Sequence, residues 1–425
     1  MKNKFILLTF SLVSLFILVN SFEVFALQEP EQKENTPTKP NFITLAKIKE
    51  AQELLKRSAP LRFVEKTTKV PLKNKKFVFK SERTKREIEL AIVDLKTGEI
   101  LTKRYWLDEA DIKKAKTITS LYLEDTENLP RFISEDPTED FQVITNWWNS
   151  FNSDLSIVRL SQPEEKDRYA VLANKFMLSN DSFAYYSERT GEKYSDMVYS
   201  PYSPVLHLPE FIAEGKTFIG NNTELAFEKL EKLGVESKAF SEQLVTDTVT
   251  QNFLKRVFIV EQTDPRKASI AEDGGRRLAE RVLVLLGINK EKAFRYTLSK
   301  TGASGLGQIM PRTYAGIVKA YPKANLTKDI DIGRIDFLNA TMTSVLVFDD
   351  KMATVFRNMN SSQRAKLEKK LQTEPDFINE IRAAAYNGGA TKYRPLTATI
   401  SLKVRETVDF VKKYKMIREL KLFTP

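Results

Sequence analysis

Few residue types in this chain are able to do enzymatic chemistry. The sequence has no cysteine and a single histidine, His207. This composition excludes Ser-His and Cys-His catalysis and the common zinc sites, which need cysteine or several histidines. Any enzymatic reaction must therefore run on carboxylates, hydroxyls, lysine or arginine, and we expect no metal and no cofactor.

One carboxylate has the setting of a general acid. Four residues at steps of four positions share one face of a predicted helix: Val249, Phe253, Val257 and Glu261. A carboxyl group that closes an apolar stripe is desolvated, which raises its pKa and keeps it protonated near neutral pH. Protonation of a glycosidic oxygen needs such an acid. The alternative is that Glu261 pairs with a nearby arginine at the helix end.

A glycine-rich stretch, "SKTGASGLGQIMPRTY", has the composition of a turn that walls a cleft. Gly302, Gly305 and Gly307 permit positive φ angles and a close approach of the backbone. The amide of Gln308 can donate to and accept from a polar ligand, and Pro311 suits the first turn of a following helix. A purely structural turn has the same composition, so this stretch alone does not define a site.

Three motifs, taken in order, resemble the catalytic domain of the soluble-type lytic transglycosylases, which share the goose-type lysozyme fold. They are "GASGLGQIMP" at 302–311, "AYNGG" at 385–389 and "ETVDFV" at 406–411. The family carries Gly-Ala-x-Gly-Leu-Met-Gln-(Ile/Val)-Met-Pro, then Ala-Tyr-Asn-Ala-Gly, then Glu-Thr followed by an aromatic-Val pair. This chain departs from the family at Gly307, where methionine is usual, and at Gly388, where alanine is usual.

The resemblance places the acid at the end of an apolar helix, shortly before a serine that Ser299 matches. Glu291 precedes Ser299 by eight residues, but it follows a predicted helix stop at Gly287 and lies in the solvated first turn of a new element. Glu261 precedes Ser299 by 38 residues and requires an insertion, yet it closes an apolar stripe. We favour Glu261 as the acid and keep Glu291 as the alternative.

By this resemblance, which covers about residues 245–415, the chain is a murein lytic transglycosylase. Such an enzyme cleaves the β-1,4 bond between N-acetylmuramic acid and N-acetylglucosamine in the glycan strands of peptidoglycan. It leaves a 1,6-anhydromuramyl end, and a single glutamate serves first as acid and then as base. The resemblance also implies the residues that line the sugar site: Ser299, Gly302, Ala303, Gly305, Gln308, Met310, Tyr386 and Asn387.

Two alternatives stay open at this point. The same fold supports hydrolysis by water, as in goose-type lysozyme, and a second carboxylate across the cleft, such as Glu272 or Asp273, would favour it. The other alternative is a non-catalytic peptidoglycan-binding or scaffold protein on a degenerate catalytic domain. Gly307 and the long spacing from Glu261 to Ser299 are the departures that support it.

The elements that must position these residues divide the chain in two. Residues 206–425 are dominated by helical periodicity, and the resemblance implies a lysozyme-like helical domain. Residues 44–205 form a mixed region with strands, in which two alternating runs around 96–98 predict a hairpin. There, Trp147 and Trp148 either form a sugar-stacking platform or belong to the core or an interface. The chain is therefore predicted to be an α+β protein.

The N-terminus and the charge indicate where the protein acts. Residues 1–26 combine lysines, an apolar run and small residues at a cleavage position, and we predict an export signal there, followed by a flexible linker at 27–43. Without cysteine the exported chain is not a lipoprotein, and we expect it in the periplasm or cell envelope. The net charge of +11 suits anionic cell-wall polymers or membrane surfaces rather than nucleic acid. Residues 44–205 are a candidate docking region for other envelope proteins.

Overall fold

The structure, a computed structural model, describes most of the chain from residue 42 onward. The described residues are 42–71, 77–118, 129–165, 167–177, 196–264, 267, 271–299, 301–401 and 403–423. The predicted export signal at 1–26 and nearly all of the predicted linker at 27–43 lie outside them. The described residues belong to one compact unit, Pro40–Pro425. None of the helices in these ranges combines the length and the apolar character needed to cross a bilayer.

An antiparallel sheet of five strands is built around one long strand, β2. The strands are β1 (Phe63–Pro71), β2 (Phe77–Asp94), β3 (Ile100–Asp108), β6 (Tyr169–Phe176) and β7 (Met197–Tyr199). The second half of β2 is buried because it pairs with β3 and β6 on its two edges, and the helix α1 (Leu45–Arg57) packs against it. The hairpin predicted at 96–98 is confirmed by the pairing of β2 with β3.

Two further elements follow this sheet in the first part of the chain. The helix α2 (Glu109–Ile118) comes directly after β3. A separate two-stranded sheet is formed by β4 (Phe141–Trp147) and β5 (Asp154–Arg159). The antiparallel pairing of β4 with β5 ends beside Trp147, which is paired with Asp154. This small sheet is the part of the strand region that lies next to the candidate site.

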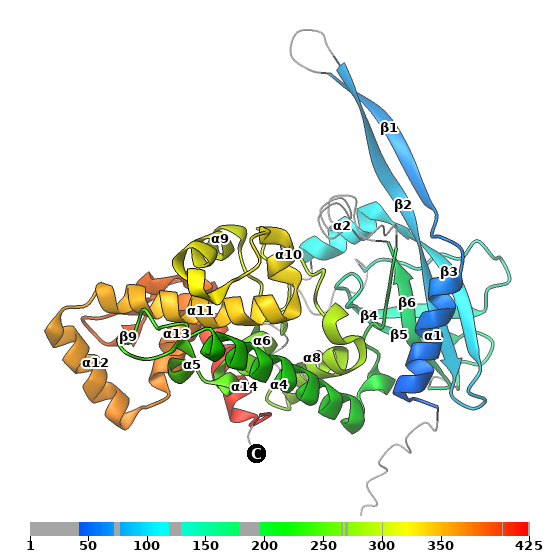
Figure 1. The fold of residues 1–425 in the computed structure, drawn as a ribbon. Helices are drawn as coiled ribbons and strands as arrows, with labels where there is room; N and C mark the ends of the chain where they lie inside the picture. The colour runs from blue at the N-terminus through cyan, green and yellow to red at the C-terminus, as the bar shows by residue number, and fades with distance from the viewer. Residues whose placement is uncertain are drawn as a thin grey trace, which may run out of the picture. The chain divides into compact units, whose positions relative to one another are not determined.

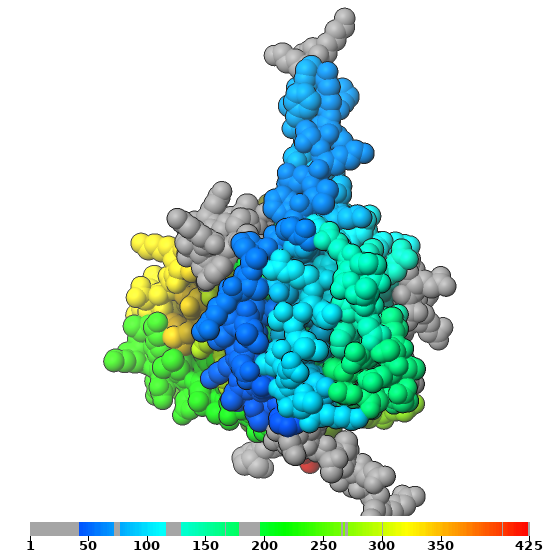
Figure 2. All heavy atoms as spheres, turned by 90° about the vertical axis from the view of Figure 1, so that its right-hand side faces the viewer, coloured from blue at the N-terminus to red at the C-terminus, as the bar shows by residue number. Residues whose placement is uncertain are grey.

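The first half of β2 and its partner β1 form a two-stranded ribbon that projects from the sheet (Figures 1 and 2). Its register runs from Phe63↔Arg86 to Pro71↔Phe77. Among the described strands, β3 joins β2 only from Lys85 onward, so the outer part of the ribbon has two strands and two open edges. Most of its side chains are exposed.

The part of the chain after β7 is mainly helical. Its helices are α4 (Pro209–Lys232), α5 (Val245–Thr248), α6 (Gln251–Glu261), α8 (Arg276–Asn289), α9 (Pro311–Ala320), α10 (Ile330–Ile335), α11 (Phe337–Arg357), α12 (Ser361–Thr373), α13 (Phe377–Gly388) and α14 (Arg405–Glu419). Short 3-10 turns and one small hairpin complete it: η2 (Pro204–Leu206), η3 (Lys290–Lys292), η4 (Pro322–Ala324), η5 (Ala390–Lys392), β8 (Tyr393–Arg394) and β9 (Thr399–Ile400).

The order of strands and then helices makes the chain an α+β protein, as predicted. α11 is buried along most of its length because α4, α9, α10 and α13 pack around it (Figure 1). The predicted boundary between residues 44–205 and 206–425 falls within η2. The two sides of this boundary are joined by hydrogen bonds, since Asn289 exchanges two bonds of 2.9 Å with the backbone of Ser200.

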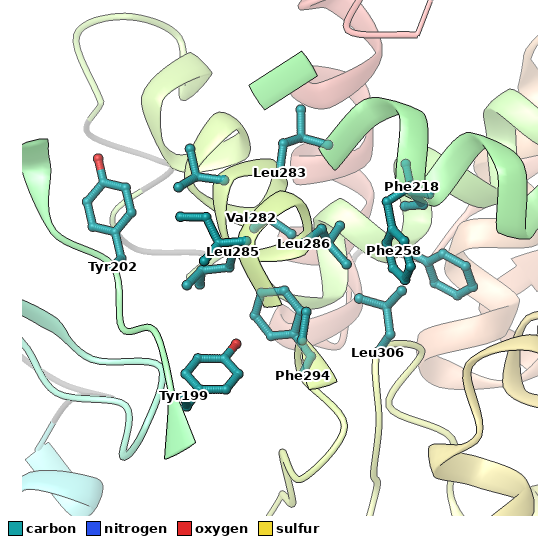
Figure 3. Close-up of a cluster of buried hydrophobic side chains, with 14 of the residues drawn as sticks. Tyr199, Tyr202, Phe218, Phe258, Val282, Leu283, Leu285, Leu286, Phe294 and Leu306 are labelled. Atoms are coloured by element: carbon teal, nitrogen blue, oxygen red, sulfur yellow. The ribbon is translucent and has the colours of Figure 1, made fainter. Parts of the chain in front are cut away.

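The predicted helix stop at Gly287 is wrong, because α8 continues to Asn289. Gly287 instead allows α8 to approach α4 closely: a Cβ atom there would lie 2.3 Å from the carbonyl oxygen of Phe211. Gly215 of α4 has the matching role against Leu283. Figure 3 shows part of the core next to this packing, in which residues of α8 lie between Phe258 of α6 and two tyrosines, Tyr199 at the end of β7 and Tyr202 after it.

Candidate active site

Glu261 is the last residue of α6 and is held at the end of a buried helix. The helix begins after Thr250, whose hydroxyl accepts a hydrogen bond of 3.2 Å from the backbone N–H of Phe253. Phe253 and Val257 are buried on the predicted face, while Val249 is also buried but precedes the helix. Glu261 itself is only half-buried, so its carboxyl group lies where the apolar face meets solvent.

Two neighbouring cavities meet at Glu261. The larger has a volume of about 540 Å³ and the smaller about 280 Å³. Four residues line both cavities: Glu261, Gln308, Asn387 and Glu406. The two cavities are therefore parts of one cleft, and the carboxyl group of Glu261 lies at the junction between them.

The surroundings of Glu261 favour its protonated form. Burial raises the pKa of Glu261 to about 8, the ammonium group of Lys413 opposes this rise, and the carboxylate of Glu406 adds to it. Desolvation penalises the charged form, and a like charge nearby does the same. The setting of Glu261 thus favours the protonated form, which a general acid requires.

Lys413 fixes the end of the helix that carries Glu261. It lies on α14, and its Nζ donates hydrogen bonds of 2.7 Å to the carbonyl oxygens of Val260 and Thr263. The last carbonyls of a helix have no partner within the helix, so a buried cation there is stabilising. Burial lowers the pKa of Lys413, and the carboxylate of Glu261 opposes that shift. No motif in the sequence marked Lys413 as part of the site. The one indication of its role was a lysine among the apolar positions of the last helix.

The glycine-rich stretch forms the turn that was predicted, between Ser299 and the start of α9. The hydroxyl of Ser299 accepts a hydrogen bond of 2.9 Å from the N–H of Ala303. Gly302 and Gly305 have positive φ angles of 88° and 75°. A Cβ atom on Gly305 would lie 2.3 Å from the carbonyl oxygen of Arg334, so only glycine fits there. The helix start expected at Pro311 is confirmed.

Arg334 supports this turn from its buried side. Its guanidinium donates hydrogen bonds to the carbonyl oxygens of Gly302 at 2.6 Å and Ile309 at 3.1 Å. It also pairs with the carboxylate of Asp331 at 3.0 Å. One side chain thus joins both ends of the turn. No pattern in the sequence singled out Arg334, because the two turn carbonyls that it bonds lie 32 and 25 residues away along the chain.

Gln262 connects the end of α6 directly to the turn. Its Nε2 donates a hydrogen bond of 2.8 Å to the carbonyl oxygen of Leu306. Because Gln262 is the residue after Glu261, this bond fixes the distance between the carboxyl group and the turn. The insertion between Glu261 and Ser299 therefore does not separate them in space, and both line the smaller cavity.

Tyr386 and Asn387 lie in the last turn of α13. The hydroxyl of Tyr386 donates a hydrogen bond to the carbonyl oxygen of Gly307, and its ring packs against Phe348. Burial raises the pKa of Tyr386, so its hydroxyl keeps its proton. A Cβ atom on Gly307 would lie 3.3 Å from the hydroxyl of Tyr386 and 2.9 Å from Oγ of Ser344. Gly307 therefore lies close to both hydroxyl groups, and a side chain there would have to displace them.

The structure brings most of the predicted site residues together. Four of them line only the smaller cavity, Ser299, Ala303, Met310 and Tyr386, and two line both cavities, Gln308 and Asn387. Gly302 and Gly305 shape the turn and line neither cavity. The alternative acid, Glu291, is exposed in η3 and lines neither cavity.

The carboxylates suggested for the opposite side of the cleft are not the ones found there. Glu272 and Asp273 are exposed and line neither cavity. Glu406, at the start of α14, lines both cavities and raises the pKa of Glu261. The residue that faces Glu261 thus comes from the last of the three sequence motifs and not from the insertion.

The strand region contributes a wall of the larger cavity. Trp147, at the end of β4, lines it together with Asn149. The guanidinium of Arg281 lies 4.1 Å from the centre of the Trp147 ring and holds it from the other side of the boundary between the two regions. Trp148 is buried in the core against Phe176. Of the two alternatives for this pair, Trp147 belongs to the cleft and Trp148 to the core.

Comparisons with known proteins add no relative from which a role could be carried over. No family model, no curated protein and no solved structure matches this chain. The chemistry of the cleft therefore follows from its own residues.

Proposed function

We propose that the protein is a peptidoglycan lytic transglycosylase of the cell envelope. The observation that carries the proposal is the position of Glu261, a carboxyl group with a raised pKa at the junction of a cleft, opposite a glycine-rich turn. The cleft also offers amide groups from Gln308 and Asn387, which suit the hydroxyl and acetamido groups of a sugar. The export signal predicted at 1–26 is in keeping with a substrate outside the cytoplasm.

In the proposed reaction Glu261 acts twice. It first gives its proton to the oxygen between N-acetylmuramic acid and N-acetylglucosamine, and the bond from that oxygen to C1 breaks. The resulting carboxylate then takes the proton from the muramyl C6 hydroxyl, whose oxygen forms a bond to C1. The product is a 1,6-anhydromuramyl end, and no water is consumed. The nucleophile is part of the substrate, so proximity supplies much of what a second protein carboxylate would otherwise provide.

A second candidate function is hydrolysis by water, and one observation favours it. Glu406 is a second carboxylate in the same cleft, and it interacts electrostatically with Glu261. A base of this kind is what an inverting or water-using glycosidase needs. Analysis of the products separates the two reactions, because 1,6-anhydromuramyl ends come from the transglycosylase and reducing ends from the hydrolase.

The test of the proposal compares two single substitutions on purified peptidoglycan sacculi. Glu261→Gln keeps the shape of the side chain but removes its proton, and we expect lysis to fall by about 10² to 10⁴-fold. Glu291→Gln is the matched control, because Glu291 is exposed and outside the cleft, and we expect it to lyse sacculi like the wild type.

Unchanged lysis by Glu261→Gln would remove Glu261 as the acid. If the wild type binds sacculi but releases no products, the non-catalytic scaffold is the better interpretation. In that case binding of Glu261→Gln should equal binding of the wild type.

A further inference from the structure

The outer end of the β1–β2 ribbon exposes large apolar side chains. Phe79 is 69% exposed, and Phe77 and Val78 are 47% and 45% exposed. Exposed apolar residues are common when scattered, but a group of them at the end of a projecting element marks an interaction site. Figure 2 shows that the ribbon stands away from the rest of the surface, so these side chains are accessible.

These apolar residues occupy both faces of the ribbon. Directly opposite residues in an antiparallel pair point to the same face. The pairs Pro71↔Phe77 and Lys69↔Phe79 therefore lie on one face, and the pair Val70↔Val78 lies on the other. The ring centres of Phe77 and Phe79 are 5.5 Å apart, as expected for neighbours on one face. A protein partner docked on one face would leave the other face exposed, whereas a lipid layer surrounds both faces at once.

The same segment is positively charged. The strand residues 69–71 and 77–80 contain two lysines, Lys69 and Lys80, and no acidic residue; Glu82, two positions further along β2, forms an exposed ion pair of 2.8 Å with Lys80. Nζ of Lys69 lies 3.5 Å from the centre of the Phe77 ring, so the cation and the aromatic ring are presented together. Aromatic rings beside lysines suit the boundary between lipid headgroups and acyl chains when the headgroups are anionic. A second copy of the chain fits less well, because pairing two such tips would bring like charges together.

We propose that the outer end of the ribbon, residues 69–71 and 77–80, here called the tip, binds the surface of an anionic phospholipid membrane. The side chains of Phe77, Phe79 and Val78 enter the headgroup region, and Lys69 contacts lipid phosphates. Lys80 does so by exchanging its exposed ion pair with Glu82 for a phosphate, since exposed ion pairs contribute little free energy. The insertion is shallow, because the two open edges of the ribbon carry backbone groups that must keep water or headgroups as partners. This surface is separate from the cleft, so the inference does not depend on the proposed function.

The first experiment measures binding to vesicles. The chain is used from residue 27 onward, which keeps the whole unit Pro40–Pro425 and removes the apolar N-terminal run that would bind lipid by itself. Vesicles of equal parts phosphatidylglycerol and phosphatidylcholine should bind the protein, and vesicles of phosphatidylcholine alone should bind it much less. Raised salt should weaken the binding.

Matched variants assign the binding to the tip. Phe77→Ser with Phe79→Ser should weaken binding at least about tenfold, and Lys69→Gln with Lys80→Gln should weaken it roughly fivefold for each lysine. Leu225→Ser with Leu396→Ser is the control, since these leucines are 48% and 76% exposed elsewhere on the surface, and it should bind like the wild type. Equal binding by the wild type and the phenylalanine variant overturns the proposal, as does equal binding to both kinds of vesicle.

A second measurement locates the tip within the bilayer. Phe79→Trp should be quenched by lipids brominated near the headgroup more than by lipids brominated deep in the acyl chain, and Leu225→Trp should be quenched by neither. Absence of quenching at position 79 contradicts the proposal. Sedimentation without lipid tests whether a second copy of the chain binds the outer end of the ribbon. If the wild type forms a dimer and Phe77→Ser with Phe79→Ser makes it a monomer, the surface is a contact between two copies, and membrane binding is overturned.

Discussion

The proton on Glu261 sets the pH range in which the proposed reaction can run. Burial raises the pKa of this carboxyl group from 4.5 to about 8. Because the pKa is raised in the folded state, the protonated group contributes stability that is fully present below pH 4.5 and is lost as the pH rises to about 8. Glutamine at this position has no proton to lose.

We therefore expect the free energy of unfolding of the wild type, minus that of Glu261→Gln, to fall steadily between pH 4.5 and about 8. Urea unfolding at a series of pH values measures this difference. The rate of lysis should fall over the alkaline part of the same range, because the acid loses its proton there. A difference in stability that does not change with pH would show that Glu261 is not held protonated by its surroundings.

Lys413 is expected to act on Glu261 through position and charge. Lys413→Met removes a cation that lowers the pKa of Glu261, so the alkaline limit of activity should move to higher pH. It also leaves two carbonyl oxygens without their partner, which should cost about 1–3 kcal/mol of stability. Lys412→Met is the control, because Lys412 is exposed on the same helix. Identical pH profiles for both variants would contradict this role.

At this scale the sequence predicts the position of Glu261 at a helix end better than it predicts the residues around it. Glu261 could be recognised from the sequence because apolar residues precede it at steps of four positions. The bonds of Lys413 join positions about 150 residues apart, and those of Arg334 cross from α10 to the turn. Contacts of this kind depend on the assembled fold and leave no local pattern.

Among the elements, the glycine-rich turn is the one whose backbone is most constrained. Gly305 has a φ of 75°, and its Cα faces the carbonyl oxygen of Arg334 with no room for a side chain. We expect Gly305→Ala to lower the free energy of unfolding by about 2 kcal/mol or more and to reduce lysis. Gly316→Ala is the control, because Gly316 lies in α9 with open space around it and should gain about 0.5–1 kcal/mol. Thermal unfolding of both variants checks the difference, and equal effects would contradict the assigned role of the turn.

The elements also show where sequence patterns mislead. The hairpin at 96–98 was predictable because a turn separates two alternating runs. The helix stop at Gly287 was wrong because glycine serves two purposes, ending helices and allowing them to pack closely, and the sequence does not distinguish them. Here the deciding fact is that Gly215 lies opposite on α4, where it allows the same approach.

In the whole molecule, the strand region and the helical region both line the cleft. Trp147 comes from the strand region and lines the cavity that holds Glu261. We expect Trp147→Ala to raise KM for glycan strands about tenfold with a smaller effect on kcat, because the ring binds substrate without taking part in proton transfer. Trp106→Ala is the control: its ring also lies under an arginine, Arg62, but outside the cleft. Equal kinetics for the two variants would exclude Trp147 from the site.

The role of residues 44–205 could not be predicted from the sequence for a physical reason. No chemical motif marks Trp147, and its place in the cleft depends on its contact with Arg281 of α8. The hydrogen bond from Arg281 to the carbonyl oxygen of Asn152 is part of that packing and joins the two regions. The docking of envelope proteins on this region stays a prediction.

The length of the β1–β2 ribbon has a consequence for where the enzyme would cut. Its paired positions run from Phe63↔Arg86 to Pro71↔Phe77, which at about 3.3 Å per residue gives a reach of about 30 Å. With its tip on a membrane, the ribbon is a spacer that sets how far from the lipid surface the cleft can work. Deleting Lys66 and Thr67 together with Ser81 and Glu82 would shorten this spacer by about 7 Å, keep the alternation of faces and leave Lys69 and Lys80 in place. Glycan strands at different heights above the membrane would then come within reach.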